Sequence, residues 1–158
     1  VKRIVEENKD VEVVFPVHLN PKVREIVNDI LKDVERIHLI DPLDYKPFAN
    51  LMAKSYLIMT DSGGIQEEAP SLGKPVIVLR TETERPEAVE AGTVKVVGVR
   101  ENDIFETVNR LINNEEEYRK MANAVNPYGD GKASDRIVDA LLYYFGIEKK
   151  SVKEFNIY

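Results

Sequence analysis

The sequence predicts an α/β domain in which a parallel β-sheet has helices on both faces. Short apolar runs of strand length alternate with amphipathic segments of helical spacing, which indicates βαβ units. Turn and cap residues separate these segments at regular intervals. At 158 residues the chain is long enough for one domain with its own core. In such sheets ligands bind at the carboxyl ends of the strands.

In the first part of the chain, cap residues mark where the helices begin. Asn20 and Pro21 suit the N-cap and the first helical position. An apolar stripe at helical spacing then runs to Leu31. Asp41-Pro42 opens the next helix, which passes through Phe48. We expect the end of a helix at 1–9, strands at 11–17, 37–40 and 56–60, and helices between these strands.

The second part alternates in the same way and then becomes helical. Gly73-Lys74 leads into a strand, and a short helix lies between Thr83 and Gly92. We assign residues 1–145 to one domain and residues 146–158 to a C-terminal tail. The remaining elements are expected as strands at 75–79 and 94–97 and helices at 65–72, 102–113, 115–124 and 132–145.

Two consecutive glycines lie between the strand at 56–60 and the helical pattern that follows. Gly63 and Gly64 have no Cβ, so backbone N–H groups there can approach a ligand closely. The helix behind them adds unpaired N–H groups and the positive end of its dipole. Glu68 lies about one turn further on, where its carboxylate can accept hydrogen bonds from a sugar diol. Ser62 to Gly64 is therefore a candidate anion site, and a plain capped turn fits the local pattern equally well.

Other candidate groups follow predicted strands at the same edge of the sheet. Arg85 precedes a proline at a helix N-terminus and suits bidentate phosphate contacts, although a solvated surface arginine has the same pattern. Phe48 can stack on a base, or belong to the core. His18 follows a strand and can contact a ligand, whereas we interpret His38 as structural. The turn at 126–131 fits an interhelix loop as well as a ligand contact.

Composition excludes several classes of protein and site. The formal charge of −6 argues against a nucleic-acid binder. The absence of cysteine excludes disulfides and thiolate metal sites, and no apolar run approaches the roughly 20 residues of a membrane span. No hydrolytic triad or calcium-loop spacing is present. We expect a cytoplasmic protein with no metal and no cofactor.

Several short motifs occur in a characteristic order along the chain: Pro16–Pro21, Asp41–Tyr45 with Phe48, Thr60–Pro70, Leu72–Pro75, Thr83–Glu87, Ala91–Thr93 and Asn126–Gly131. Over nearly all of residues 11–140 this order resembles the non-hydrolysing UDP-N-acetylglucosamine 2-epimerases. The resemblance implies the second, C-terminal domain of a GT-B-type fold, in which two Rossmann-like domains enclose a cleft.

The resemblance also implies roles for particular residues and a ligand, a UDP-sugar. The diphosphate is expected at Ser62, Gly63 and Gly64, and the ribose hydroxyls are expected at Glu68. The uracil is expected near Phe48, and the phosphate side of the sugar near Arg85. In bacterial members the histidine that matches His18 lies near a second, regulatory UDP-N-acetylglucosamine.

The family's reaction interconverts UDP-GlcNAc and UDP-ManNAc by elimination and re-addition of UDP, and it supplies polysaccharide precursors. The family's catalytic carboxylates belong to its first domain, so we name no catalytic residue and expect this chain alone to be inactive. The intact protein is expected to be a homodimer. The alternative function is a UDP-sugar-binding module or the C-terminal half of a GT-B-type glycosyltransferase. The sugar is not determined by these residues.

One strand of the domain is expected to be missing. The chain has no initiator methionine and opens inside a helix, so we expect a piece of a longer protein. The family's second domain begins with a strand upstream of Val1, and this strand is central in the common 3-2-1-4-5-6 order. Strands 11–17 and 56–61 would then face an empty slot. We expect another segment or a second copy to fill it, in preference to direct pairing of these two strands.

Overall fold

The computed structural model describes residues 1–149 and 152, and its strands form two parallel sheets. β4 lies at the centre of the larger sheet, so both of its edges are paired. Because every pairing is parallel, the carboxyl ends of the strands in each sheet lie at one edge, as the alternating pattern predicts. The two sheets are β1 (Val13–Pro16) with β2 (Ile37–Ile40), and β3 (Ile58–Thr60) with β4 (Val76–Val78) and β5 (Val94–Val96).

β1 and β3 do not pair with each other anywhere in the described part of the chain, because they belong to separate sheets. Direct pairing of these strands would have shown that the predicted strand order was wrong. Because the two strands belong to separate sheets, the expectation that they do not pair directly is confirmed. What pairs with their free edges stays a prediction.

Cap residues begin the helices in the first part of the chain largely as predicted. The Asn20 side chain accepts a hydrogen bond from the Lys22 backbone N–H at 3.0 Å, and Pro21 is the first helical residue. The third helix begins later than Asp41-Pro42 suggested, with Asp44 at its N-cap. These helices are α1 (Lys2–Glu7), α2 (Pro21–Leu31) and α3 (Tyr45–Lys54).

The helix predicted at 65–72 begins earlier, at Gly63, and changes to a 3₁₀ helix at Ala69. Pro70 has no N–H to continue the α-helical bonds. Gly73, with φ of 66°, then ends the segment in the left-handed region. The helical segments of the second part are α4 (Gly63–Glu68), η1 (Ala69–Leu72), α5 (Pro86–Glu90), α6 (Glu101–Asn113), α7 (Glu115–Ala122) and α8 (Ala133–Tyr144).

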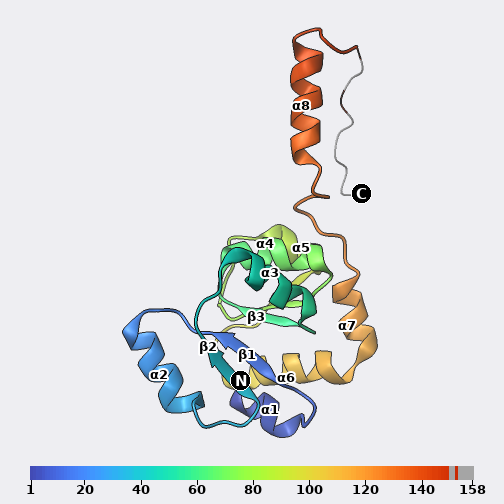
Figure 1. Cartoon of the computed structure of the whole chain (residues 1–158). Coiled ribbons are helices and arrows are strands. Elements are labelled where there is room, and N and C mark those ends of the chain that lie inside the picture. Colours follow the sequence, from blue (N-terminus) through green and yellow to red (C-terminus); the bar gives the residue numbers. More distant parts are fainter. Residues whose placement is uncertain (150–151, 153–158) are drawn as a thin grey trace.

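The core lies on both faces of β4. Val76 and Val78 point to one face, where they pack with residues of α3, η1 and α5. Ile77 points to the other face and packs with residues of α1 and α6. Figure 1 shows these two groups of helices on opposite sides of the strands. The predicted architecture, a parallel sheet with helices on both faces, is confirmed.

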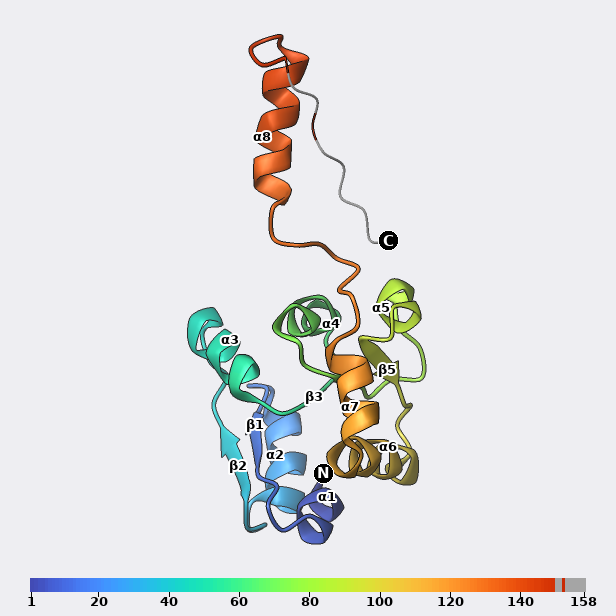
Figure 2. The same cartoon turned by 90° about the vertical axis from the view of Figure 1, so that its right-hand side faces the viewer.

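α8 projects away from the rest of the domain in both views (Figures 1 and 2). No residue of this helix is buried, and its exposed apolar side chains include Ile137, Val138 and Leu141. The predicted domain boundary at residue 145 therefore includes a helix that contributes nothing to the described core. Most of the predicted tail, at 150–151 and 153–158, lies outside the described residues. No described helix is both long and apolar enough to cross a membrane.

Candidate functional site

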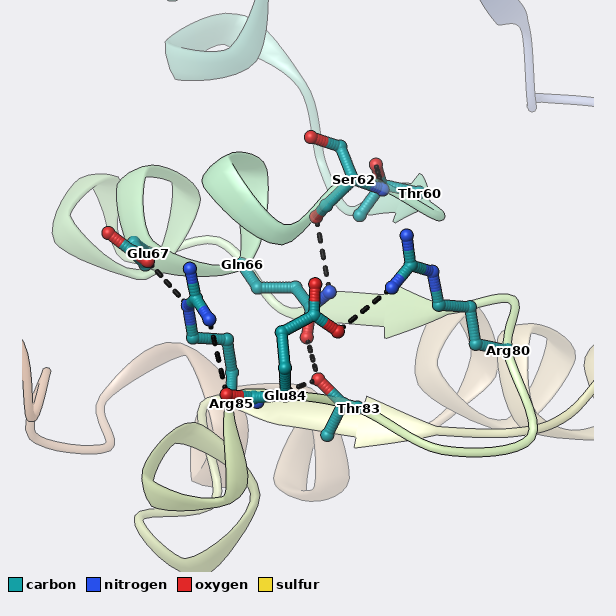
Figure 3. Close-up of polar contacts among 8 residues, drawn as sticks. All are labelled: Thr60, Ser62, Gln66, Glu67, Arg80, Thr83, Glu84 and Arg85. Atoms are coloured by element: carbon teal, nitrogen blue, oxygen red, sulfur yellow. Dashed lines mark hydrogen bonds and ion pairs between the residues drawn. The ribbon is translucent and has the colours of Figure 1, made fainter.

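The candidate site lies where the turn after β3, residues 61–64, faces the loop after β4, residues 79–85 (Figure 3). Both segments follow the carboxyl ends of strands in the same sheet. An open hollow of about 500 Å³ is lined by Leu79–Glu84 and Val99. The loop lines this hollow and the turn does not. We therefore define the site by the backbone donors of the turn and not by the hollow.

The turn presents backbone donors at the start of α4. Ser62 is the N-cap residue, and its N–H already donates to Thr60 Oγ1 at 3.0 Å. Gly63 and Gly64 are the first two helical residues, whose N–H groups have no acceptor within the helix. A Cβ added at Gly64 would have Ser62 Oγ as its nearest neighbour, at 4.0 Å. The donors available to a ligand are therefore those of Gly63 and Gly64, whereas the Ser62 N–H is occupied.

A carboxylate lies against the turn. A Cβ built on Gly63 would lie 2.9 Å from Glu84 Oε1, and Arg80 Nη1 donates to the same carboxylate at 2.9 Å. The pKa of Glu84 is lowered, first by a hydrogen bond to its own backbone and then by Arg80. The carboxylate therefore occupies the space in front of the turn as an anion.

Arg85 lies on the same edge as predicted, at the N-cap of α5. Its guanidinium forms an ion pair with Glu67 of α4, and this hydrogen bond is the main cause of its raised pKa. The Arg85 side chain also approaches the turn, since Nη2 lies 3.8 Å from the Cβ position of Gly63. A cation thus approaches the turn that carries the two peptide donors, and such groups can together bind a phosphate.

Sequence reasoning missed two polar residues, Gln66 and Thr83, that connect the turn with the loop. Gln66 is buried in α4 and bonds both to Ser62 and to Thr83 (Figure 3). The available signal was helical spacing, because Gln66 precedes the buried Ala69 and Pro70 by three and four residues and therefore lies on the buried face.

Glu68 and Phe48, the two residues predicted to contact the nucleoside, lie in different environments. Glu68 is exposed at the end of α4, as a contact with a sugar diol requires. Phe48 in α3 is half-buried and packs against the cluster that contains Met52 and Val76. The core interpretation of Phe48 is confirmed, and its contact with uracil stays a prediction.

The remaining predicted residues lie in local hydrogen-bond networks. His18 is exposed after β1, and its Nδ1 accepts from the Asn20 N–H at 3.1 Å. His38 is half-exposed on β2 and pairs with Glu12 at 3.0 Å. Asp130, in the turn before α8, holds both guanidinium nitrogens of Arg136 at 2.7 Å. This ion pair gives Asp130 a structural role, because it joins the turn to α8.

Comparison with known proteins gives one consistent match. The family model described as UDP-N-acetylglucosamine 2-epimerase matches residues 1–142. A Thermotoga maritima relative is 64% identical over 93% of this chain. The UDP-N-acetylglucosamine 2-epimerase of Bacillus subtilis is 55% identical over 99% of it. The S. aureus MnaA–UDP co-structure superposes with a TM-score of 0.90 at 50% identity over 98% of it. This chain covers 39%, 41% and 42% of those three proteins, respectively, so it spans about 40% of their length.

Proposed function

The chain belongs to the UDP-N-acetylglucosamine 2-epimerase family, and we propose that it forms the UDP-binding part of such an epimerase. The observation that carries this proposal is the pair of N–H groups at Gly63 and Gly64, which have no acceptor within their helix, in a turn that Arg85 Nη2 approaches to 3.8 Å from the Cβ position of Gly63. The S. aureus relative, whose structure was solved with UDP, supports the choice of ligand.

In the proposed complex the diphosphate accepts hydrogen bonds from Gly63 and Gly64 and meets Arg85. Glu68 binds the ribose hydroxyls, and the uracil lies near Phe48. The Glu84 carboxylate must turn away from Gly63 before the diphosphate enters, because two anions cannot share that space. Its release leaves Arg80 free to face the incoming phosphate.

The proposed reaction explains why the diphosphate needs such a site. The C2 proton of the sugar has no adjacent carbonyl, so direct removal is too costly. Elimination breaks the C1–O bond, removes the C2 proton and releases UDP, giving 2-acetamidoglucal. Re-addition of UDP with protonation at C2 from the other face gives the epimer. Negative charge grows on the leaving diphosphate, where fixed N–H groups and a cation stabilise the transition state.

The proton-transfer groups are proposed to lie in the part of the enzyme that this chain does not contain, because it spans about 40% of its relatives. The intact protein is proposed to be a cytoplasmic homodimer that takes UDP-GlcNAc as substrate. His18 is proposed to lie near a second UDP-sugar, since it is exposed and its bonds are local.

Product analysis of the intact protein tests the proposed function. Incubation with UDP-GlcNAc should give UDP-ManNAc, together with traces of 2-acetamidoglucal and UDP. Transfer of the sugar to an added acceptor, without epimer, would instead support a GT-B-type glycosyltransferase. Binding of UDP-GlcNAc without any conversion would support a binding module.

A further inference from the structure

We propose that Gln66 is a positioning residue that sets the spacing between the Gly63–Gly64 turn and the loop that carries Arg85. The inference rests on the proposed function, because it treats the turn and the loop as the two walls of the diphosphate site. Gln66 itself is not expected to touch the ligand. It acts through the segments to which it is bonded.

Gln66 is fully buried, at 0% exposure, although it belongs to a short helix at the edge of the domain. A buried amide is costly unless both of its ends are hydrogen-bonded. Here Nε2 donates to the Ser62 carbonyl at 3.1 Å, and Oε1 accepts from the Thr83 hydroxyl at 2.5 Å (Figure 3). Both ends of the amide are therefore used to join the turn to the loop.

The chain of hydrogen bonds continues from Thr83 into the loop. Thr83 Oγ1 also accepts from the Arg85 backbone N–H at 3.1 Å. Three hydrogen bonds therefore connect the carbonyl of Ser62 with the backbone of Arg85. The two ends of this chain of bonds, the Ser62 carbonyl and the Arg85 N–H, set the direction of each bond. A carbonyl only accepts a hydrogen bond, and a backbone N–H only donates one. Gln66 must supply one donor and one acceptor, as an amide does and a carboxylate does not.

The two walls meet at the proposed phosphate position. The Cβ position of Gly63 lies 2.9 Å from Glu84 Oε1 and 3.8 Å from Arg85 Nη2, so the loop reaches the turn there. If the chain of bonds is broken, the loop can shift and Arg85 no longer meets the same phosphate as the turn. A small misplacement of this kind weakens binding even in a folded protein.

The test is a calorimetric titration of UDP into the intact protein and its variants. Gln66→Glu removes the donor to Ser62 with almost no change of shape, and Thr83→Val removes the hydroxyl. Gln66→Glu breaks one bond of this chain and Thr83→Val breaks two, so each should weaken UDP binding at least about tenfold. Thr83→Ser keeps the hydroxyl and should restore affinity to within about twofold of wild type. Thr107→Val, at a half-exposed threonine of α6 outside the candidate site, is the matched control and should have no effect.

The possible outcomes separate this inference from the proposed function. If wild type does not bind UDP, the proposed function fails and the positioning role fails with it. If wild type binds and both Gln66→Glu and Thr83→Val bind equally well, only the positioning role is overturned. If Gln66→Glu does not fold, the comparison of Thr83→Val with Thr83→Ser decides, because Thr83 is half-exposed. A lower melting temperature for Thr83→Val with unchanged UDP affinity would show a purely structural role and also overturn the inference.

Discussion

Both arginines at the candidate site are paired with carboxylates. Arg80 bonds to Glu84 and Arg85 to Glu67, and each carboxylate competes with any anion that enters. The two pairs neutralise both arginines in a chain whose formal charge is −6. In the proposed complex the diphosphate would therefore exchange with these carboxylates at the same cations.

Replacement of Glu84 by glutamine should strengthen UDP binding severalfold. The variant removes the charge in front of Gly63 and leaves Arg80 without its anionic partner. Calorimetry on the intact protein measures the effect, with Glu82→Gln as control for the loss of one exposed charge on the same loop. Equal affinities of the two variants would show that Glu84 does not compete with the ligand.

The same residue predicts a dependence of stability on pH. The folded pKa of Glu84 is lowered from its ordinary value of 4.5, so its contribution to stability is fully present above that value. That contribution is lost progressively as the pH falls from there through the lowered pKa. The difference in unfolding free energy between wild type and Glu84→Gln should thus be constant at neutral pH and shrink as the pH falls below 4.5.

At the residue scale the sequence predicted the backbone donors and Arg85, but not their partners. Gly63 and Gly64 stand out because two glycines between a strand and a helix allow a ligand to approach the backbone, although a plain capped turn has the same pattern. Glu67 and Arg85 are 18 residues apart, and Gln66 and Thr83 are 17 apart. Such pairs depend on how two loops close over the sheet edge, which local patterns do not describe.

At the scale of elements the order of strands and helices could be predicted, and their ends less well. The apolar run at 56–60 forms a strand only at Ile58–Thr60, because strand length depends on the partner as well as on composition. The start of α2 was predictable, since Asn20 and Pro21 act locally. The split into two sheets followed from the strand order implied by the resemblance.

Hydrogen exchange should reveal the free edges of β1 and β3. Successive amides of a strand point to opposite sides, and Val13 and Val17 donate toward β2, so the Val14 amide points away from it. By the same argument the Met59 amide points away from β4. In the 158-residue chain alone these two amides should exchange much faster than that of Phe15, which faces β2.

In the intact protein we expect a parallel strand to fill the slot, and the Val14 and Met59 amides should then be as protected as Phe15. Fast exchange of both amides in the intact protein would show that nothing pairs with these edges. Protection already present in the short chain would show that these edges are paired there, either with each other or with a second copy.

At the scale of the whole molecule, two features indicate that more chain completes the structure. α8 exposes apolar side chains, and the chain spans about 40% of its relatives. The exposure of α8 could not be predicted from local pattern, because an amphipathic helix looks the same whether its partner is present or absent. The domain boundary at residue 145 stays a prediction.

The 158-residue chain by itself should not epimerise UDP-GlcNAc. It contains one wall of the proposed cleft and no residue to which we assign proton transfer, so positioning and acid–base catalysis are both missing. Incubation of the purified chain with UDP-GlcNAc, followed by chromatography for UDP-ManNAc, measures this. The intact protein is the positive control, and turnover by the short chain above the buffer rate would contradict the prediction.

The central claim is that the diphosphate of UDP binds at the N–H groups of Gly63 and Gly64, and a Gly64→Val variant tests it most directly. A Cβ at Gly64 has open space in the ligand-free protein, with Ser62 Oγ nearest at 4.0 Å, so the variant should fold with an unchanged melting temperature. The added side chain would occupy the space that the phosphate needs. Titration calorimetry should show UDP binding to the intact wild-type protein and none to Gly64→Val. Equal UDP affinity in the two folded proteins would contradict the claim.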